Sequence, residues 1–91
     1  MSIRVQLPPV LRSVLGGERY IAGEGATIAE VIGDIAVRYP VLGLHLLDET
    51  GAIRRNIVCL HGHDAVRASD AASHAVGDGD EIVLTNALAG G

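Results

Sequence analysis

The sequence predicts an α+β domain in which one amphipathic helix covers one face of a mixed sheet of four to five strands, in the order ββαβββ. Three observations lead to this prediction: an alternating apolar segment at the start of the chain, one helix with apolar residues every three or four positions, and another alternating segment near the end. With 91 residues, the chain has room for one small hydrophobic core.

The first strand is predicted over residues 2–7, where apolar and polar side chains alternate as in a half-buried strand. Pro8-Pro9 ends it, because proline has no amide hydrogen to donate to a neighbouring strand. A loop through Gly16-Gly17 then leads to a second short strand near residues 18–22. We expect these two strands to pair in antiparallel fashion.

The one clear helix begins after Thr27, which forms a capping box with Glu30 three residues later. Pro40 biases Tyr39 away from helical geometry and ends the helix. Residues 41–47 are expected to form a further helical turn. The apolar residues of the main helix share one face, and they are Ile28, Val31, Ile32, Ile35, Ala36 and Tyr39.

The second half of the chain predicts three more strands. Residues 56–60 are rich in β-formers and run into the turn His61-Gly62-His63, and a short strand follows over residues 65–68. Asp78-Gly79 predicts a turn before the last strand, which contains Ile82 and Leu84. One helix and one mixed sheet in this order form the β-grasp arrangement. We expect the domain to span residues 1–86 and residues 87–91 to be a flexible tail ending in Gly-Gly.

Charge and composition exclude several classes of function. The net charge is −4, with seven arginines and no lysine, so the clustered cations that bind nucleic acid are missing. An acidic body would suit a partner with a basic docking surface. The sequence has no signal-peptide core and no apolar run long enough to span a membrane, which predicts a cytoplasmic protein that does not bind membranes.

No catalytic constellation is visible in the body of the chain. Gly23-x-Gly25 lacks the third glycine of a dinucleotide loop. His61 and His63 lie on one turn, but two ligands make a poor metal site, and a solvated turn is the better interpretation. Cys59 is predicted to be a small core residue, since no cationic neighbour would activate it. We therefore predict no catalytic residue, no metal site and no bound cofactor.

The chemistry is predicted to lie at the C-terminus. Leu88, Ala89 and Gly90 form a narrow thread that can enter a tunnel closed to bulkier chains, and Gly91 presents an α-carboxylate. This carboxylate is ionised at neutral pH and is a poor electrophile, so it needs activation, most simply as an acyl-adenylate. Sulfide or a persulfide could then displace AMP and leave a thiocarboxylate. A merely frayed end is the alternative interpretation.

These motifs resemble the MoaD/ThiS family of ubiquitin-like sulfur carriers. The resemblance covers the opening strand with Leu7-Pro8, the main helix, the segment Val76–Ile82 and the tail Leu88–Gly91. It implies adenylation of Gly91 by an E1-like adenylyltransferase/sulfurtransferase that uses ATP and magnesium, followed by sulfur transfer to an acceptor synthase.

Within the family, the segment Pro8–Arg12 with Gly16-Gly17 is most similar to the carriers that feed a thiocarboxylate to cysteine synthase. The small subunit of molybdopterin synthase is the close alternative. Many relatives have proline just before the tail, where this chain has Asn86, so the pathway stays open.

The resemblance also suggests a docking surface on the open face of the sheet. If Ile57 and Cys59 point toward the helix, alternation sends Val58 and Leu60 to the open face, and Val83 joins them from the last strand. Ordinary surface residues are the alternative interpretation. Two other functions stay open: a ubiquitin-like protein modifier, which the absence of lysine for self-linked chains mildly disfavours, and a plain β-grasp binding module.

Overall fold

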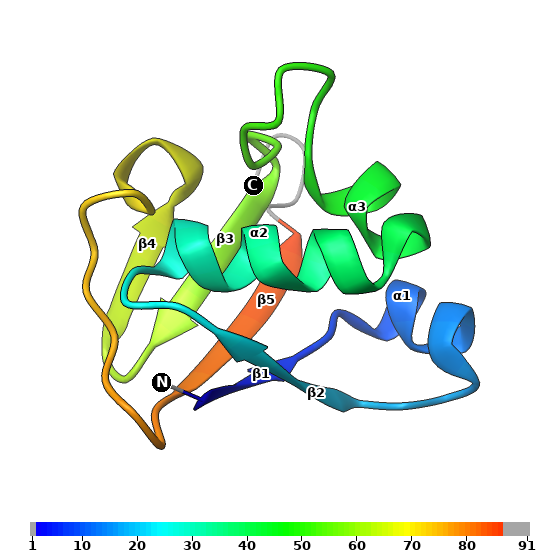
Figure 1. The fold of residues 1–91 in the computed structure, drawn as a ribbon, viewed down its shortest axis with the longest axis horizontal. Coiled ribbons are helices and arrows are strands. Elements are labelled where there is room, and N and C mark those ends of the chain that lie inside the picture. Colours follow the sequence, from blue (N-terminus) through cyan, green and yellow to red (C-terminus); the bar gives the residue numbers. More distant parts are fainter. Residues whose placement is uncertain (1, 87–91) are drawn as a thin grey trace.

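The computed structural model describes residues 2–86 and confirms the predicted β-grasp fold (Figure 1). Five strands form one mixed sheet in the order β2-β1-β5-β3-β4. None of the helices in this part of the chain has the length and apolar character needed to cross a lipid bilayer. The elements are β1 Ser2–Gln6, α1 Pro9–Arg12, the 3-10 helix η1 Ser13–Leu15, β2 Tyr20–Glu24, α2 Ile28–Arg38, α3 Pro40–Leu46, β3 Ile57–His61, β4 Asp64–Arg67, the 3-10 helix η2 Ala68–Asp70 and β5 Glu81–Asn86.

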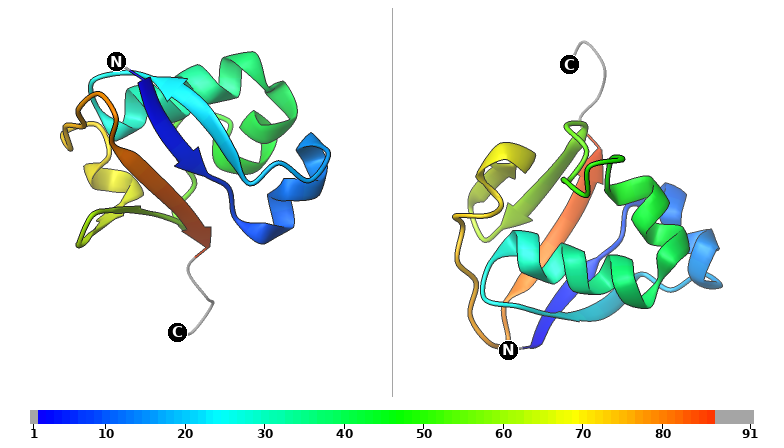
Figure 2. Two further views of the ribbon diagram at one scale, coloured as in Figure 1. Left: turned by 90° about the horizontal axis from the view of Figure 1, so that it is seen from below. Right: turned by 45° about the horizontal axis from the view of Figure 1, so that its top comes forward.

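The last strand lies at the centre of the sheet. β5 pairs with β1 in parallel and with β3 in antiparallel orientation, while β2 and β4 complete the two edges with antiparallel pairs. Because β1 and β5 are parallel, β5 ends at the opposite end of the sheet from the N-terminus (Figure 2). Neighbouring strands on both sides therefore fix the direction of the chain as it approaches Asn86.

The hydrophobic core lies between α2 and the face of the sheet that α2 crosses (Figure 1). Alternation along the strands sends every second side chain into this layer, and the apolar stripe of α2 meets it. The predicted inward position of Cys59 is confirmed, since its side chain is fully buried. The largest fully buried side chains are Ile3, Leu7, Ile28, Ile32, Ile35, Leu42, Leu46, Ile57, Ile82, Leu84, Val5 and Val31.

The start of α2 has the predicted Thr27 cap. The Thr27 hydroxyl accepts a hydrogen bond from the Glu30 amide at 3.2 Å. The Glu30 carboxylate accepts from the amide of Ala26 at 2.9 Å, one residue earlier than in a standard capping box. The Thr27 hydroxyl therefore satisfies a donor that the helix leaves unpaired, and the Glu30 carboxylate satisfies the amide of the residue before the cap.

The loop predicted after Pro8-Pro9 is wrong, because α1 and η1 occupy this segment. The two prolines end β1 and also begin the helix, since proline at the first helical position is already set to the helical backbone angle. The side chain of Leu11, which belongs to α1, is buried in the hydrophobic core. Gly16, with φ of 68°, then ends η1 in the left-handed conformation that glycine adopts without strain.

Other boundaries differ by one or two residues from the predicted ones. The predicted turn over residues 41–47 is confirmed as α3, with Leu42 and Leu46 buried. The second strand begins at Tyr20 rather than at residue 18, and β4 begins at Asp64. The ends of these strands follow the backbone pairing with neighbouring strands, which alternation does not report.

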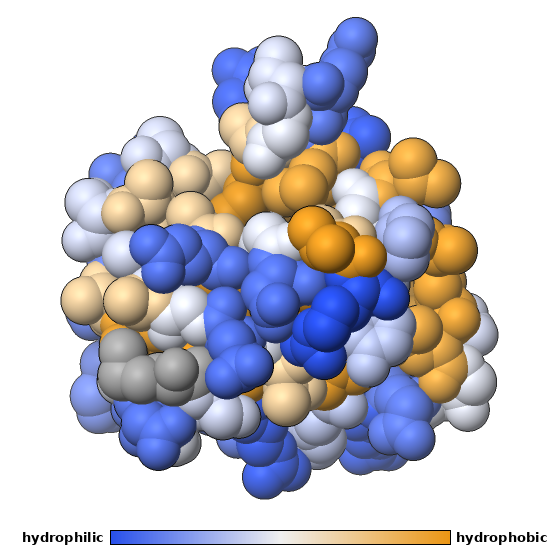
Figure 3. All heavy atoms as spheres, viewed as in Figure 1, coloured by the Kyte–Doolittle hydropathy of each residue, from blue (hydrophilic) through white to orange (hydrophobic). Residues whose placement is uncertain are grey.

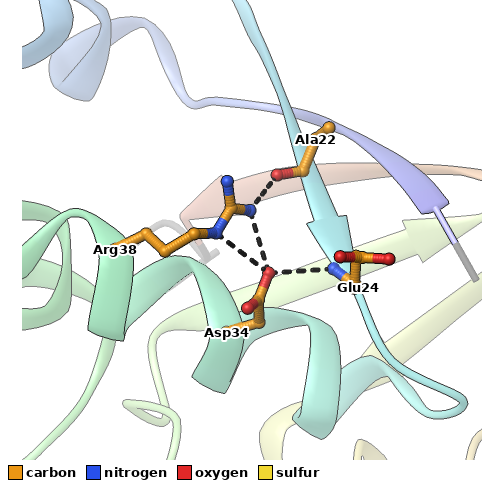
Figure 4. A network of polar contacts seen from close by, with 4 residues as sticks. All are labelled: Ala22, Glu24, Asp34 and Arg38. Carbon is orange, nitrogen blue, oxygen red and sulfur yellow. Dashed lines mark hydrogen bonds and ion pairs between the residues drawn. The ribbon is translucent and has the colours of Figure 1, made fainter.

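Side chains of α2 satisfy outward backbone groups of the edge strand β2 (Figure 4). The Asp34 carboxylate accepts a hydrogen bond from the Glu24 amide at 3.0 Å. The Arg38 guanidinium donates to the Ala22 carbonyl and pairs with Asp34 at 2.8 Å. An open edge strand is a template for pairing with another chain. Asp34 and Arg38 therefore close part of this edge from within the same molecule.

We expect replacement of Asp34 by asparagine to destabilise the protein at neutral pH more than in acid. The hydrogen bond from Glu24, and then Arg38, lowers the pKa of Asp34. Since its folded-state pKa lies below the unfolded one, ionised Asp34 stabilises the fold above about pH 4, and this contribution is lost as the pH falls through the folded pKa. Urea titrations of the wild type and Asp34→Asn at neutral pH and at about pH 3 measure this. An equal loss at both pH values would contradict it.

Apolar side chains are also exposed on the helical side of the molecule. Val37, Val41 and Leu44 are 79%, 51% and 72% exposed, and Val10 is 66% exposed. In the space-filling view, apolar side chains gather over α3 and α1 at the right (Figure 3). Exposed apolar area therefore occurs on both sides of the molecule, and exposure alone does not select a docking face.

Candidate functional site

The predicted reactive residue and its thread lie outside the residues that the structure describes. In the sequence, Leu88, Ala89, Gly90 and Gly91 come one residue after β5, whose last residue Asn86 pairs with Ile57 of β3. The described part of the site is therefore the end of β5 and the surface beside it. A central strand held on both sides gives the following segment a fixed starting point.

Along the second half of β5 and the paired part of β3, the structure brings together the three predicted docking residues. Leu60 of β3 lies opposite Val83 of β5, and Val58 lies opposite Thr85. Leu60 is 37% exposed, whereas Val58 and Val83 are half-buried. All three alternate with buried neighbours and lie on the face away from α2. We call Val58, Leu60 and Val83 the apolar strip.

Polar groups border the apolar strip on the β1 side. The Arg4 guanidinium lies over the ring of Tyr20, at 3.8 Å from its centroid, and its Nε is 3.7 Å from a carboxylate oxygen of Glu81. Stacking of this kind holds an arginine in place on the surface. Arg4 is therefore already engaged by its own neighbours.

On the β4 side, a hollow of about 410 Å³ adjoins the apolar strip. Its lining contains two arginines, and sequence reasoning did not single it out. Strand alternation would place Arg67 on the open face, but only the pairing of β4 with β3 sets it opposite Val58. We call it the arginine hollow, and it is lined by Arg55, Val58, Arg67, Ala68 and Ser69.

Cys59 has the chemistry of a core residue. Burial raises the pKa of its thiol to about 11, because the surroundings of the side chain disfavour the thiolate. The thiolate is the nucleophilic form of cysteine. At neutral pH the Cys59 side chain is therefore an unreactive thiol, as the sequence predicted.

The predicted solvated turn describes His63 but is wrong for His61. His61 Nδ1 lies 2.8 Å from His74 Nε2, and His61 Nε2 lies 2.9 Å from an Asp80 carboxylate oxygen. The same oxygen accepts a hydrogen bond from the Gly77 amide, and this bond, followed by the one with His61, lowers the pKa of Asp80. No local pattern predicts this contact, because His61 and His74 meet only when the segment after β4 folds back.

This histidine network ties the end of β3 to the segment before β5, at the opposite end of the sheet from Asn86. No group of three or more His, Cys, Asp or Glu side chains within residues 2–86 is arranged to hold a metal ion. The side chains of the network hydrogen-bond to one another instead, and they join β3 to the segment that precedes β5.

A model of the ThiS family matches residues 5–91, a span that includes the central strands, the helices and the C-terminal glycines. The chain belongs to the ThiS family. Sulfur carriers of this family are non-catalytic co-substrates of other enzymes, so this ThiS-family carrier is not an enzyme.

Individual relatives of this ThiS-family carrier agree with the assignment. Sulfur carrier protein CysO of Mycobacterium bovis is 30% identical over 93 aligned positions, which cover 100% of both chains. In the crystal structure of the Amycolatopsis orientalis BexX/CysO complex, a chain that is 32% identical superimposes with a TM-score of 0.79, covering 98% of this chain and 99% of the other. SAMP1 from Haloferax volcanii, 22% identical, has a TM-score of 0.79 over 100% of both chains, which shows a shared fold.

Proposed function

We propose that this ThiS-family carrier is activated at Gly91 and delivers sulfur to a biosynthetic enzyme as a thiocarboxylate. An E1-like adenylyltransferase/sulfurtransferase activates it with ATP and magnesium, which the partner binds. We place this reaction in the cytoplasm. The observation that carries the proposal is the family match through residue 91, together with the position of β5 as the central strand that leads into the Gly-Gly segment.

The chemistry follows from the properties of a carboxylate. One carboxylate oxygen of Gly91 attacks the α-phosphorus of ATP, which forms the acyl-adenylate and releases pyrophosphate. Sulfide, or the terminal sulfur of a persulfide, then attacks the acyl carbon and displaces AMP. With a persulfide donor, the intermediate acyl disulfide needs a thiol reductant to release the thiocarboxylate. The partner enzymes supply this catalysis, and Leu88, Ala89 and Gly90 supply the thread that reaches their active sites.

For the acceptor, we propose an enzyme of cysteine biosynthesis. The likeness to two CysO proteins, at 30% and 32% identity over nearly the whole chain, supports this choice. The small subunit of molybdopterin synthase is the alternative within the same family. Incubation of the thiocarboxylated carrier with each purified acceptor from the host discriminates them, because only the correct acceptor consumes the thiocarboxylate and forms its sulfur-containing product.

Transfer of the activated Gly91 to an amine would instead make the chain a protein modifier. SAMP1, the small archaeal modifier protein 1 of Haloferax volcanii, shares this fold, but at 22% identity in one structure and 20% in another the likeness shows the fold alone. A modifier and a carrier pass through the same acyl-adenylate and differ in the nucleophile that accepts the acyl group. Conjugates of high mass in the host, in place of thiocarboxylate, would favour the modifier.

Intact mass spectrometry of the chain purified from its own host tests the proposed function. We expect a species heavier by the difference between sulfur and oxygen, located at the C-terminus by fragmentation. Alkylation must label this species, since oxidation of Met1 adds an oxygen and gives a mass gain of the same nominal size. A chain that is unmodified and inert toward ATP with every E1-like enzyme of that host would contradict the proposal.

We propose that the apolar strip docks on the activating enzyme. Its side chains lie on the open face from the middle of β5 toward its end, so a partner that covers them stands close to the place where the chain continues beyond Asn86. Exposed apolar groups next to a reactive end mark a partner site better than isolated ones do. The complex of BexX with CysO supports docking of such carriers on other proteins.

We expect Val83→Glu to weaken activation at least tenfold, because a charge would be buried without a partner in the interface. ATP–pyrophosphate exchange with the host's adenylyltransferase measures this, and a thermal melt checks folding. Val37→Glu is the matched control, since Val37 is 79% exposed on the helical side. If Val83→Glu folds and is activated at the wild-type rate, or if Val37→Glu is equally impaired, the strip does not dock.

A further inference from the structure

The arginine hollow has a composition unlike the rest of this surface. Arg67 at the end of β4 and Arg55 in the turn before β3 both line it, while Val58 and Ala68 supply apolar carbon. Val58 also belongs to the apolar strip and pairs with Thr85, one residue before the end of β5. Through Val58, the arginine hollow is therefore continuous with the apolar strip and lies near the end of β5.

The hollow is lined by two positive side chains, whereas the chain as a whole has a net charge of −4. Within residues 2–86, the ion pairs are Arg4 with Glu81, Arg38 with Asp34, and His61 with Asp80. Arg55 and Arg67 take part in none of these. Several carboxylates lie instead at the opposite end of the sheet, at the start of β4 and around the turn into β5: Asp64, Asp78, Asp80 and Glu81.

The groups in the hollow match a carboxylate on a short aliphatic stem. A guanidinium presents a planar fork of N–H donors that binds a carboxylate through two parallel hydrogen bonds. The Ser69 hydroxyl offers another donor, and Val58 and Ala68 offer apolar surface to methylene groups. Two like charges beside one hollow repel each other, and an anion placed between them removes this cost.

We propose that the arginine hollow binds an aspartate or glutamate side chain of the activating enzyme, and so holds the end of β5 at the mouth of that enzyme's active site. This inference rests on the proposed function and adds an acidic anchor to the apolar docking surface. It also revises the expectation from net charge, which suggested a basic partner surface. The charge beside the tail, rather than the total charge, sets the chemistry of the partner at this place.

The test is binding of the full-length chain to the host's adenylyltransferase, measured by calorimetry without nucleotide. We expect the double variant Arg55→Glu/Arg67→Glu to raise Kd about tenfold or more at low ionic strength, and the difference to shrink as sodium chloride is added. The milder variant Arg55→Gln/Arg67→Gln keeps the test valid if charge reversal disturbs folding, and we expect it to raise Kd by a smaller factor. Arg19→Glu, an exposed change at the opposite edge of the sheet, is the control and should retain the wild-type Kd.

Three results would overturn the inference: a folded double variant with the wild-type Kd, an equal loss in Arg19→Glu, or a loss that appears only when ATP is present. The last result would mean that the arginines contact nucleotide phosphates instead of a carboxylate. Failure of the proposed function looks different, because then the wild-type chain itself is neither bound nor adenylated. In that case the inference fails with it.

Discussion

Removal of Gly91 is expected to lower thiocarboxylate formation more than a hundredfold. The shortened chain still ends in a glycine carboxylate, but this group lies about 3.3 Å short of its place for each residue removed. Attack on the α-phosphate requires the reacting atoms to lie about 3–3.5 Å apart, and a misplacement of about 1 Å can cost a hundredfold in rate. ATP–pyrophosphate exchange and mass spectrometry after sulfur loading measure the two steps.

Two variants keep the length of the chain and change only a side chain. Ala89→Gly is the control, because it makes the thread narrower and should retain activity. Gly90→Val adds a branched side chain and should block entry of the thread into the tunnel of the partner enzyme. The body of the protein is unchanged in all three variants, so their thermal melts should coincide with the wild type. Normal loading of the truncated chain would show that Gly91 is not the reactive residue.

Gly25→Ala is expected to be the most destabilising small substitution in the body of the chain. A Cβ at Gly25 would lie 2.6 Å from the Glu30 Cβ and 2.8 Å from the Val31 amide nitrogen. These atoms belong to the first turn of α2 and cannot rotate away. We expect the free energy of unfolding to fall by about 3 kcal/mol, the upper part of the range for overpacking. For a domain of this size, each kcal/mol lost lowers Tm by roughly 4–8 °C.

Gly33→Ala is the matched control, because it makes the same chemical change where the new Cβ meets no atom within 4 Å other than the adjoining backbone of its own helix. Gly33 lies in the middle of α2, where alanine is favoured over glycine by about 0.5–1 kcal/mol. We therefore expect Gly33→Ala to raise the unfolding midpoint in urea and Gly25→Ala to lower it. A Gly25→Ala variant as stable as the wild type would mean that the β2–α2 connection can shift freely.

This contrast explains the Gly23-x-Gly25 pattern, which sequence reasoning could only dismiss as an incomplete dinucleotide loop. A Cβ at Gly23 would lie 2.8 Å from a Val31 methyl carbon and 3.0 Å from two carbons of Ile35. Both glycines allow β2 and the start of α2 to approach closely. The pattern reports packing between neighbouring elements, and no sequence periodicity reveals which elements become neighbours.

The sequence by itself determined the features that depend on local spacing. Alternation identified β1 and β5, the three- and four-residue steps identified the buried face of α2, and Thr27 and Pro40 marked its two ends. Alternation, together with the β-grasp topology that the resemblance implied, placed Val58, Leu60 and Val83 on one face. These signals are local because a strand or helix repeats every two or about 3.6 residues.

Only the tertiary structure decided which distant residues meet. The parallel pairing of β1 with β5 made the last strand central, and the pairing of β3 with β4 set Arg67 beside Val58. The return of the chain after β4 brought His74 to His61, and the packing of α2 against β2 brought Arg38 to the Ala22 carbonyl. Such contacts join residues that are far apart in the chain, so they are set by the burial of apolar faces against each other and leave no period in the sequence.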